Sequence, residues 1–257
     1  MLQRSRFITI GLALLLAAAL IDRAVGVGPA EIRPVRVIHC EDVEDHRPTV
    51  VTGVAVTRDG RTIAAATDDH RVLVWDGTTG ELKAHLEGHS DWIHSVVLSS
   101  DGATLASGGG DRMLCLWNMT EQKRLLQIPA CKNKVAAVCI HPNNQQLAVV
   151  GFSDQLQIVN RSTGHMTQEM EGPSVDIHTI TFSPNGERMA AAGRNGKIRI
   201  WNVADGSSQK DIETDNRRIR AMAFSPDGRW LAAAGTSPSI DVFDSSTGQP
   251  VMSLATL

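Results

Sequence analysis

One set of residues has the types that nucleophilic chemistry requires. His89, Ser107 and Asp111 lie within a single short stretch of the chain. A serine hydroxyl, an imidazole and a carboxylate can together form the nucleophile, base and orienting acid of a hydrolase. The stretch has no nucleophile elbow, the sharp strand-to-helix turn that exposes such a serine and supplies an oxyanion hole. These residues therefore favour a buried hydrogen-bond chain over catalysis.

Two further histidines raise the question of a metal ion. His94 and His178 occupy equivalent positions in the repeat described below, a register that also holds Arg220 and no carboxylate. Metal binding needs several ligands converging at about 2 Å, and a third ligand is missing. The four cysteines fit no metal-ligand spacing either; they are Cys40, Cys115, Cys131 and Cys139. The sequence predicts no metal and no cofactor.

Short strands must position the first set of residues. Residues 89–118 read as three strands separated by two tight turns, with apolar runs at 93–98, 105–107 and 114–117 and turn residues at 99–102 and 108–111. His89 precedes the first predicted strand and Ser107 lies on the second. Asp111 lies in the second turn and Trp117 on the third strand. These four side chains can form one polar chain.

The same pattern recurs along most of the chain. Residues 48–257 divide into five units of 42 residues without an insertion. The position of Trp117 repeats as an aromatic or apolar residue: Trp75, Trp117, Val159, Trp201 and Phe243. The first turn of each unit ends in a residue that tolerates positive φ: Gly60, Gly102, Asn144, Gly186 and Gly228. With a fourth strand, as at 81–87 and 249–254, each unit predicts one sheet of a β-propeller.

The repeat resembles the WD repeat of the G-protein β-subunit kind, and the resemblance covers all five units. In that family the matching Trp, Ser or Thr, His and Asp side chains form a hydrogen-bonded tetrad, which implies a structural tetrad of His89, Ser107, Asp111 and Trp117. The other units depart from it. The resemblance implies an all-β WD-repeat β-propeller with four-stranded blades at about 48–89, 90–131, 132–173, 174–215 and 216–257.

Five blades leave the ring incomplete. WD propellers usually close with about seven blades, and an open fan leaves blade faces and a strand edge uncovered. We expect a partial or open propeller, which is either a truncated relative of a longer protein or one completed by another chain, including a second copy. A closed five-bladed ring is the alternative.

The first residues differ from the rest. Arg4 and Arg6 precede an uncharged apolar run at 7–21, and small residues follow at 24–26. This order is typical of a secretory signal, and the run is shorter than the roughly 20 residues that span a membrane. We expect residues 1–26 to be a signal peptide, with a membrane anchor as the alternative, and the protein to be secreted or periplasmic. Residues 27–47 hold a predicted strand at 31–39 and an acidic loop.

Positions that vary between blades are free to serve binding. In WD proteins three such registers lie on the narrow face around the central channel. From these registers we take seven residues, which we call the rim: Trp92, His94, Phe152, His178, Arg194, Arg218 and Arg220. Aromatic residues and arginines are typical of interface hot spots. A net charge of −3 argues against a nucleic-acid partner. The sequence predicts a non-catalytic scaffold for protein partners outside the cytoplasm.

Two alternatives stay open. Residues 76–80 and 244–248 resemble the Asp-x-x-Thr-Gly turns of quinone-dependent dehydrogenase propellers, which would make the chain an extracytoplasmic enzyme. No carboxylate–histidine set converges on the channel to support that reading. The other alternative is an incomplete fragment of a larger propeller scaffold.

Overall fold

The computed structural model describes Ile38 and residues 49–255. Within them the chain forms five antiparallel four-stranded sheets and no helix. Each sheet contains four consecutive strands, so each repeat unit builds one blade. This confirms the prediction of an all-β propeller with five blades.

The strand bounds follow the repeat. Blade 1 contains β1 (Val51–Val56), β2 (Thr62–Thr67), β3 (Arg71–Asp76) and β4 (Leu82–Glu87). Blade 2 contains β5 (Ile93–Leu98), β6 (Thr104–Gly109), β7 (Met113–Asn118) and β8 (Lys123–Pro129). Blade 3 contains β9 (Val135–Ile140), β10 (Gln146–Gly151), β11 (Gln155–Asn160) and β12 (Met166–Glu171). Blade 4 contains β13 (Ile177–Phe182), β14 (Arg188–Gly193), β15 (Lys197–Asn202) and β16 (Ser208–Glu213). Blade 5 contains β17 (Ile219–Phe224), β18 (Trp230–Gly235), β19 (Ser239–Asp244) and β20 (Pro250–Ala255).

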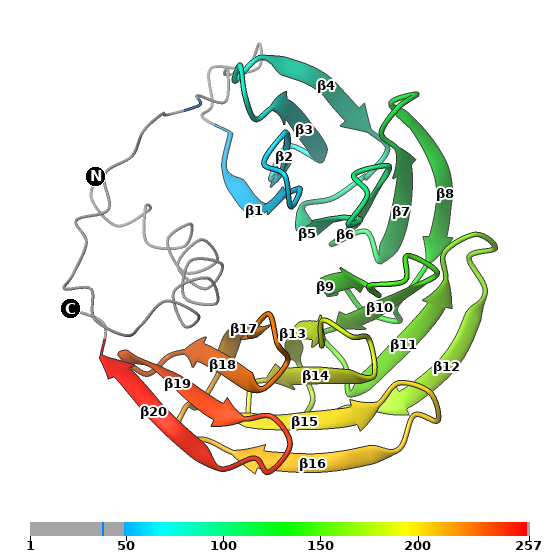
Figure 1. The fold of residues 1–257 in the computed structure, drawn as a ribbon. Coiled ribbons are helices and arrows are strands. Elements are labelled where there is room, and N and C mark those ends of the chain that lie inside the picture. Colours follow the sequence, from blue (N-terminus) through cyan, green and yellow to red (C-terminus); the bar gives the residue numbers. More distant parts are fainter. Residues whose placement is uncertain (1–37, 39–48, 256–257) are drawn as a thin grey trace.

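The blades stand side by side in an arc, with the first strand of each blade innermost and the fourth outermost (Figure 1). The innermost strands contact one another in order, from β1 to β5, β9, β13 and β17. In the described part of the chain no sheet combines strands from both ends, and the sheets do not close into a ring. Blades 1 and 5 are therefore the two ends of an open propeller (Figure 1).

The turn between the first and second strands has the same backbone conformation in all five blades. Its last residue has a positive φ in every blade: 71° at Gly60, 69° at Gly102, 60° at Asn144, 77° at Gly186 and 72° at Gly228. In blade 2 the turn is also held by Ser99, whose Oγ donates to Asp101 at 2.5 Å and accepts the Thr104 N–H at 2.9 Å. The predicted need for a left-handed residue at this position is confirmed.

The core lies between neighbouring blades. Second strands carry small side chains, and all six residues of β6 are buried. Between blades 1 and 2 the packed side chains include Ala64, Ala66, Val72, Val74, Ile93, Val96, Leu105 and Trp117. Alternate residues of a strand point to opposite faces of the sheet, so each central blade is apolar on both faces. Small residues on the second strand let adjacent sheets approach closely.

Most of the predicted N-terminal features lie outside the described residues. These are the signal peptide at 1–26, the acidic loop at 41–47 and all of the predicted strand except Ile38. Ile38 itself has no strand assignment. It packs against Ala65, Leu73 and Trp75, on the face of blade 1 that is turned away from blade 2. No helix within the described residues has the length and apolar character to cross a membrane.

Candidate functional site

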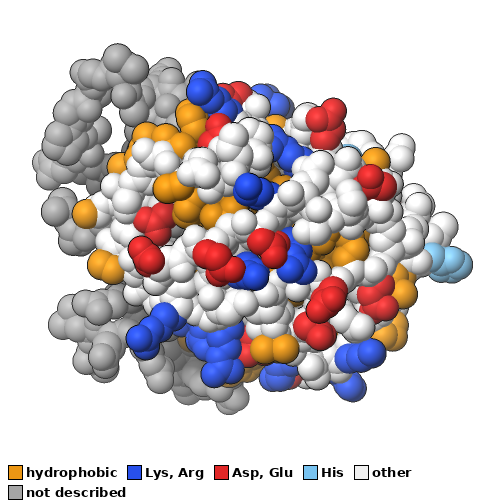
Figure 2. Space-filling view, turned by 90° about the horizontal axis from the view of Figure 1, so that it is seen from below, with side chains coloured by type: hydrophobic (Ala, Val, Ile, Leu, Met, Phe, Trp, Pro, Cys, Tyr) orange, Lys and Arg blue, Asp and Glu red, His pale blue; other side chains and the backbone are white. Residues whose placement is uncertain are grey.

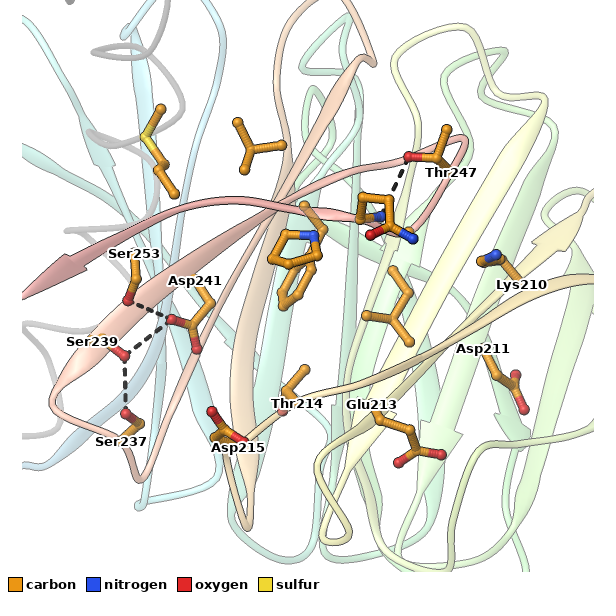
Figure 3. Close-up of a pocket in the computed structure, with 17 residues that line it drawn as sticks. Lys210, Asp211, Glu213, Thr214, Asp215, Ser237, Ser239, Asp241, Thr247 and Ser253 are labelled. Atoms are coloured by element: carbon orange, nitrogen blue, oxygen red, sulfur yellow. Dashed lines mark hydrogen bonds between the residues drawn. The ribbon is translucent and has the colours of Figure 1, made fainter.

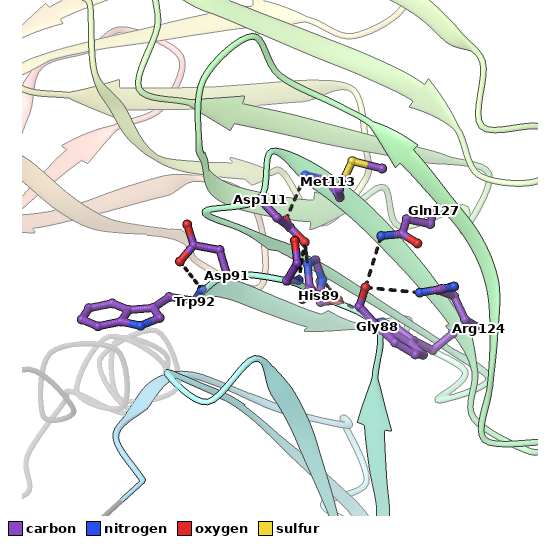
Figure 4. A network of polar contacts seen from close by, with 11 residues as sticks. Gly88, His89, Asp91, Trp92, Asp111, Met113, Arg124 and Gln127 are labelled. Atoms are coloured by element: carbon purple, nitrogen blue, oxygen red, sulfur yellow. Dashed lines mark hydrogen bonds and ion pairs between the residues drawn. The ribbon is translucent and has the colours of Figure 1, made fainter. Parts of the chain in front are cut away.

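The Ser-His-Asp set of blade 2 is part of one hydrogen-bond chain (Figure 4). Trp117 Nε1–H donates to Ser107 Oγ at 2.9 Å, and Ser107 Oγ lies 2.8 Å from His89 Nε2. His89 Nδ1 lies 2.8 Å from Asp111 Oδ2. With the His89 proton on Nδ1, each donor in this chain has one acceptor. The chain links the loop before β5, strand β6, the turn after it and strand β7.

The side chains of this hydrogen-bond chain are enclosed by the fold. Ser107 is fully buried, and the side chains of His89 and Asp111 are 0% and 4% exposed. Burial alone would raise the pKa of Asp111, but hydrogen bonds from His89 and from the Met113 N–H lower it below its ordinary value. Ser107 Oγ is thus buried between its two partners, Trp117 and His89.

Other blades make the same connection between loop and sheet with different side chains. In blade 4, Asn195 Nδ2 donates to the Pro173 carbonyl at 2.9 Å. In blade 5, buried Asn216 donates through Nδ2 to Asp241 at 3.1 Å and accepts the Ser237 N–H at 2.8 Å. A search for the Trp–Ser–His–Asp pattern misses these links. The signal that could have found them is an asparagine at the loop or turn position of a blade without the tetrad.

The structure brings together rim residues from three blades. His94 lies on β5 and His178 on β13, while Phe152 follows β10. The His94 and Phe152 rings meet edge to face with centroids 6.2 Å apart, and those of Phe152 and His178 with centroids 5.6 Å apart. Phe152 therefore lies between the two histidines, which sequence position alone does not reveal.

The pKa of each of the two histidines lies below its ordinary value. Burial is the main reason that the pKa of each imidazole falls below its ordinary value, and Lys134 near His94 and Arg218 near His178 lower it further. The Nε2 atom of each ring is buried and has no hydrogen-bond partner among the described residues. Two imidazoles that resist protonation thus flank Phe152 at one axial end of blades 2 to 4.

Trp92 and the charged rim residues surround this stack. Trp92 is 50% exposed, and its indole extends away from the hydrogen-bond chain of blade 2 (Figure 4). The backbone N–H of Trp92 donates to Asp91 Oδ1 at 2.8 Å, and Asp91 also pairs with Lys134 at 3.5 Å. Both ends of this ion pair are well exposed, so it contributes little to stability. Sequence reasoning did not assign Asp91 or Lys134 to the site.

The remaining rim residues are the three arginines. Arg194 follows β14 and pairs with Asp176 at 3.4 Å. Arg218 immediately precedes β17, and Arg220 lies on that strand. All three are close enough to His178 to act on its pKa. Asp176, which has a positive φ of 61°, is a third charged residue that sequence reasoning did not assign to the site.

A groove lies between the outer strands β16 and β20 (Figure 3). It has a volume of about 710 Å³ and several acidic side chains. Asp211 accepts two hydrogen bonds from Arg199, at 2.7 and 2.9 Å, and Glu213 pairs with Lys197 at 3.0 Å. Acidic and basic side chains are interspersed on the surface seen from below (Figure 2). Because Asp211, Glu213 and Asp241 have partners within the fold, we assign no ligand to this groove.

The turns that resemble a dehydrogenase motif have a local explanation. Asp76 Oδ1 accepts the N–H groups of Thr78 and Thr79 at 2.7 and 3.0 Å. Asn118 closes the equivalent turn of blade 2 in the same way, through the N–H groups of Thr120 and Glu121. A hydrogen bond from Lys83 and these backbone donors hold the pKa of Asp76 well below its usual range. Turn geometry alone accounts for the motif.

The described residues contain no group of three or more His, Cys, Asp or Glu side chains that could hold a metal ion. Cys115, Cys131 and Cys139 are free thiols. Burial raises the pKa of Cys115 to about 12 and that of Cys131 to about 11. Such thiols pack as small apolar groups and are poor nucleophiles. Cys40 lies outside the described residues.

Comparison with known families gives one match. Residues 50–256 match the family model described as the IFT122 first beta-propeller, a propeller of the WD-repeat type. The matched range includes every strand from β1 to β20 completely. No curated protein matches the chain significantly.

Proposed function

The chain belongs to the IFT122 first beta-propeller family, and from this premise we propose that it is a non-catalytic scaffold that binds protein partners at its rim. One observation carries the proposal. Side chains from three blades, His94, Phe152 and His178, meet at one end of the fold, in registers whose residues differ from blade to blade. The repeat keeps strands and turns alike, so residues that differ at one shared location are free for recognition.

The mechanism is presentation on a rigid support. Packed blades hold the rim residues in place before a partner arrives, which lowers the entropy cost of binding. Exposed Trp92 offers a large apolar area, and arginine guanidinium groups offer forked donors for carboxylates. The tetrad of blade 2, the feature that most resembles G-protein β-subunits, supports this surface by fixing the loop that carries Trp92.

We also propose that the scaffold acts outside the cytoplasm. The basic and apolar start of the chain supports export, and retention of that segment would tether the protein to a membrane. The net charge of −3 supports a protein partner over a nucleic acid. A second copy of the chain is a further candidate partner, because the open blades leave apolar side chains exposed.

A capture experiment tests the proposal. The full chain, immobilised, is exposed to an extract of the producing organism, beside a Trp92→Ala/Arg218→Ala variant. Leu125→Ala is the matched control, since Leu125 is 53% exposed on the outer strand β8, away from the rim. We expect the rim variant to lose partners that the wild type and the control retain. Unchanged capture by a rim variant with a wild-type thermal transition would contradict the proposal.

A further inference from the structure

The charges around His178 are predominantly cationic. Of the four ionised groups that act on its imidazole, Arg218, Arg220 and Arg194 are positive and Asp176 is negative. The whole chain has the opposite sign, with a net charge of −3. A local excess of positive charge at an exposed end of the fold favours a partner of negative charge, through both attraction and orientation.

The single carboxylate in this group is loosely held. Arg194 Nη1 lies 3.4 Å from Asp176 Oδ2, and the two side chains are 64% and 30% exposed. An exposed ion pair at this separation contributes little to stability. A carboxylate from a partner can therefore replace Asp176 at Arg194 with little loss to the fold.

The rest of the rim has a different balance of positive and negative charge. Near His94 one cation, Lys134, is outnumbered by the carboxylates of Asp91 and Asp111. The rim is thus polarised, with its cationic part at blades 4 and 5 and its exposed indole, that of Trp92, at blade 2. Phe152 lies between the two parts, in contact with both histidines. This polarity gives a bound segment a preferred direction along the rim.

We propose that the cationic part of the rim, formed by Arg194, Arg218 and Arg220 around His178, binds a carboxylate-rich peptide segment of a protein partner. This inference rests on the proposed function and names the chemistry of the partner. Guanidinium groups match carboxylates geometrically, with two parallel hydrogen bonds per pair. A long polyanion such as a nucleic acid fits less well, because the acidic remainder of the chain repels it.

Fluorescence anisotropy tests the inference with defined probes. The full chain is titrated into a fluorescein-labelled hexaglutamate peptide, and into its hexaglutamine counterpart, at low ionic strength. We expect binding of the glutamate peptide alone, weakened by added salt. The Arg218→Gln/Arg220→Gln variant should lose roughly tenfold or more in affinity, because each removed guanidinium is a charge-assisted donor. The corresponding double substitution to lysine keeps the charge and should retain part of the binding.

Arg58→Gln is the matched control, because Arg58 is an exposed arginine in the turn after β1, at the opposite end of the blade. Equal binding of both peptides, or an equal loss with Arg58→Gln, would overturn the inference. Stronger competition by inorganic phosphate or by a single-stranded oligonucleotide would overturn it too. If the glutamate peptide fails to bind while capture still depends on Trp92 and Arg218, the peptide chemistry is wrong and the scaffold function stands. If the Trp92→Ala/Arg218→Ala variant captures the same partners as the wild type, the proposed scaffold function itself is wrong.

Discussion

The hydroxyl of Ser107 lies between two buried nitrogen atoms, Trp117 Nε1 at 2.9 Å and His89 Nε2 at 2.8 Å. It is the one group that connects strand β7 to the loop before β5 through side chains of the tetrad. Each of its partners is enclosed, so neither can turn to water if the hydroxyl is removed. A buried donor or acceptor without a partner costs more than the hydrogen bond itself contributes.

We therefore expect Ser107→Ala to lower the free energy of unfolding by about 1–3 kcal/mol, the cost of leaving a buried polar group unpaired. Urea denaturation at neutral pH measures the change. Ser100→Ala is the control, because Ser100 is exposed in the turn after β5 and its nearest hydrogen bonds are long, at 3.2 and 3.4 Å. Equal losses for the two variants would show that the tetrad does not hold the blade.

The two rim histidines predict a dependence of stability on pH. Their pKa values in the folded chain lie below 6.5, mainly through burial. Below pH 6.5 the unfolded chain binds more protons at these histidines than the folded chain does. Their contribution to the free energy of unfolding is therefore complete above pH 6.5, and it declines as the pH falls toward their pKa values in the folded chain. The midpoint temperature of thermal unfolding should decrease as the pH is lowered through this range. The His94→Gln/His178→Gln variant should show a smaller decrease. Identical pH profiles for variant and wild type would contradict the assignment. Asp111 acts only at lower pH, because its pKa lies below 3.8.

Contacts between individual side chains could be predicted from the sequence only where the residue types form a known combination. His89, Ser107, Asp111 and Trp117 could be linked from their types and spacing alone, because each type has one role in a repeated pattern. The stack of Phe152 between His94 and His178 could not, since edge-to-face contact depends on how far neighbouring blades rotate. Asp176 and Lys134 stand in the same register as Trp92 and Arg218, but their ion pairs with Arg194 and Asp91 depend on side-chain reach, which register does not give.

The turns between first and second strands show how the elements are specified. Gly60 has a φ of 71°, and a Cβ at this position would have no atom within 4 Å. A substitution here therefore changes backbone strain without a steric clash. Positive φ costs an alanine about 1–2 kcal/mol, and asparagine tolerates it better.

We expect Gly60→Ala to lower the free energy of unfolding by about 1 kcal/mol and Gly60→Asn to lower it less. Asn144, which occupies the equivalent turn of blade 3 with a φ of 60°, is the natural precedent for the asparagine variant. Chemical denaturation of the two variants and the wild type measures their free energies of unfolding and so ranks their stabilities. An alanine variant as stable as the asparagine variant would mean that the turn does not require a left-handed residue.

Strand positions were predictable because a fixed period constrains every boundary. The fourth strand of blade 1, expected at 81–87, is β4 at Leu82–Glu87, and that of blade 5, expected at 249–254, is β20 at Pro250–Ala255. The predicted strand at 31–39 has no repeat partner to fix it, and it lies outside the described residues except for Ile38. Periodicity therefore located the blades but gave no information on the segment that precedes them.

At the scale of the molecule, the open arc leaves apolar side chains at its two ends. On blade 1, Val54 and Val56 pair with Ala65 and Ile63 on the face away from blade 2, and they are 38% and 41% exposed. On blade 5, Met252 and Leu254 are 46% and 43% exposed, and Met252 lies opposite Val242 on the face away from blade 4. Blade number could be counted from the sequence, whereas what covers the terminal blades could not.

These exposed residues predict self-association. Light scattering on residues 27–257 should show a particle mass that rises with concentration, because exposed apolar surface of this kind drives contact between copies. Met252→Lys/Leu254→Lys places charge on the open face of blade 5 and should shift the distribution toward the monomer. A monodisperse monomer at every concentration, for wild type and variant alike, would show that a single chain covers its own ends.

The central claim is that partners bind at the rim of a rigid, open propeller. Hydrogen exchange on the chain with and without a captured partner tests it most directly. We predict slowed exchange in the segments that carry the rim, at 88–94, 150–154, 174–178, 192–196 and 216–220. Exchange should be unchanged in the turns at 57–60 and 99–102, at the opposite end. Protection confined to those opposite turns, or to the outer strands, would contradict the claim.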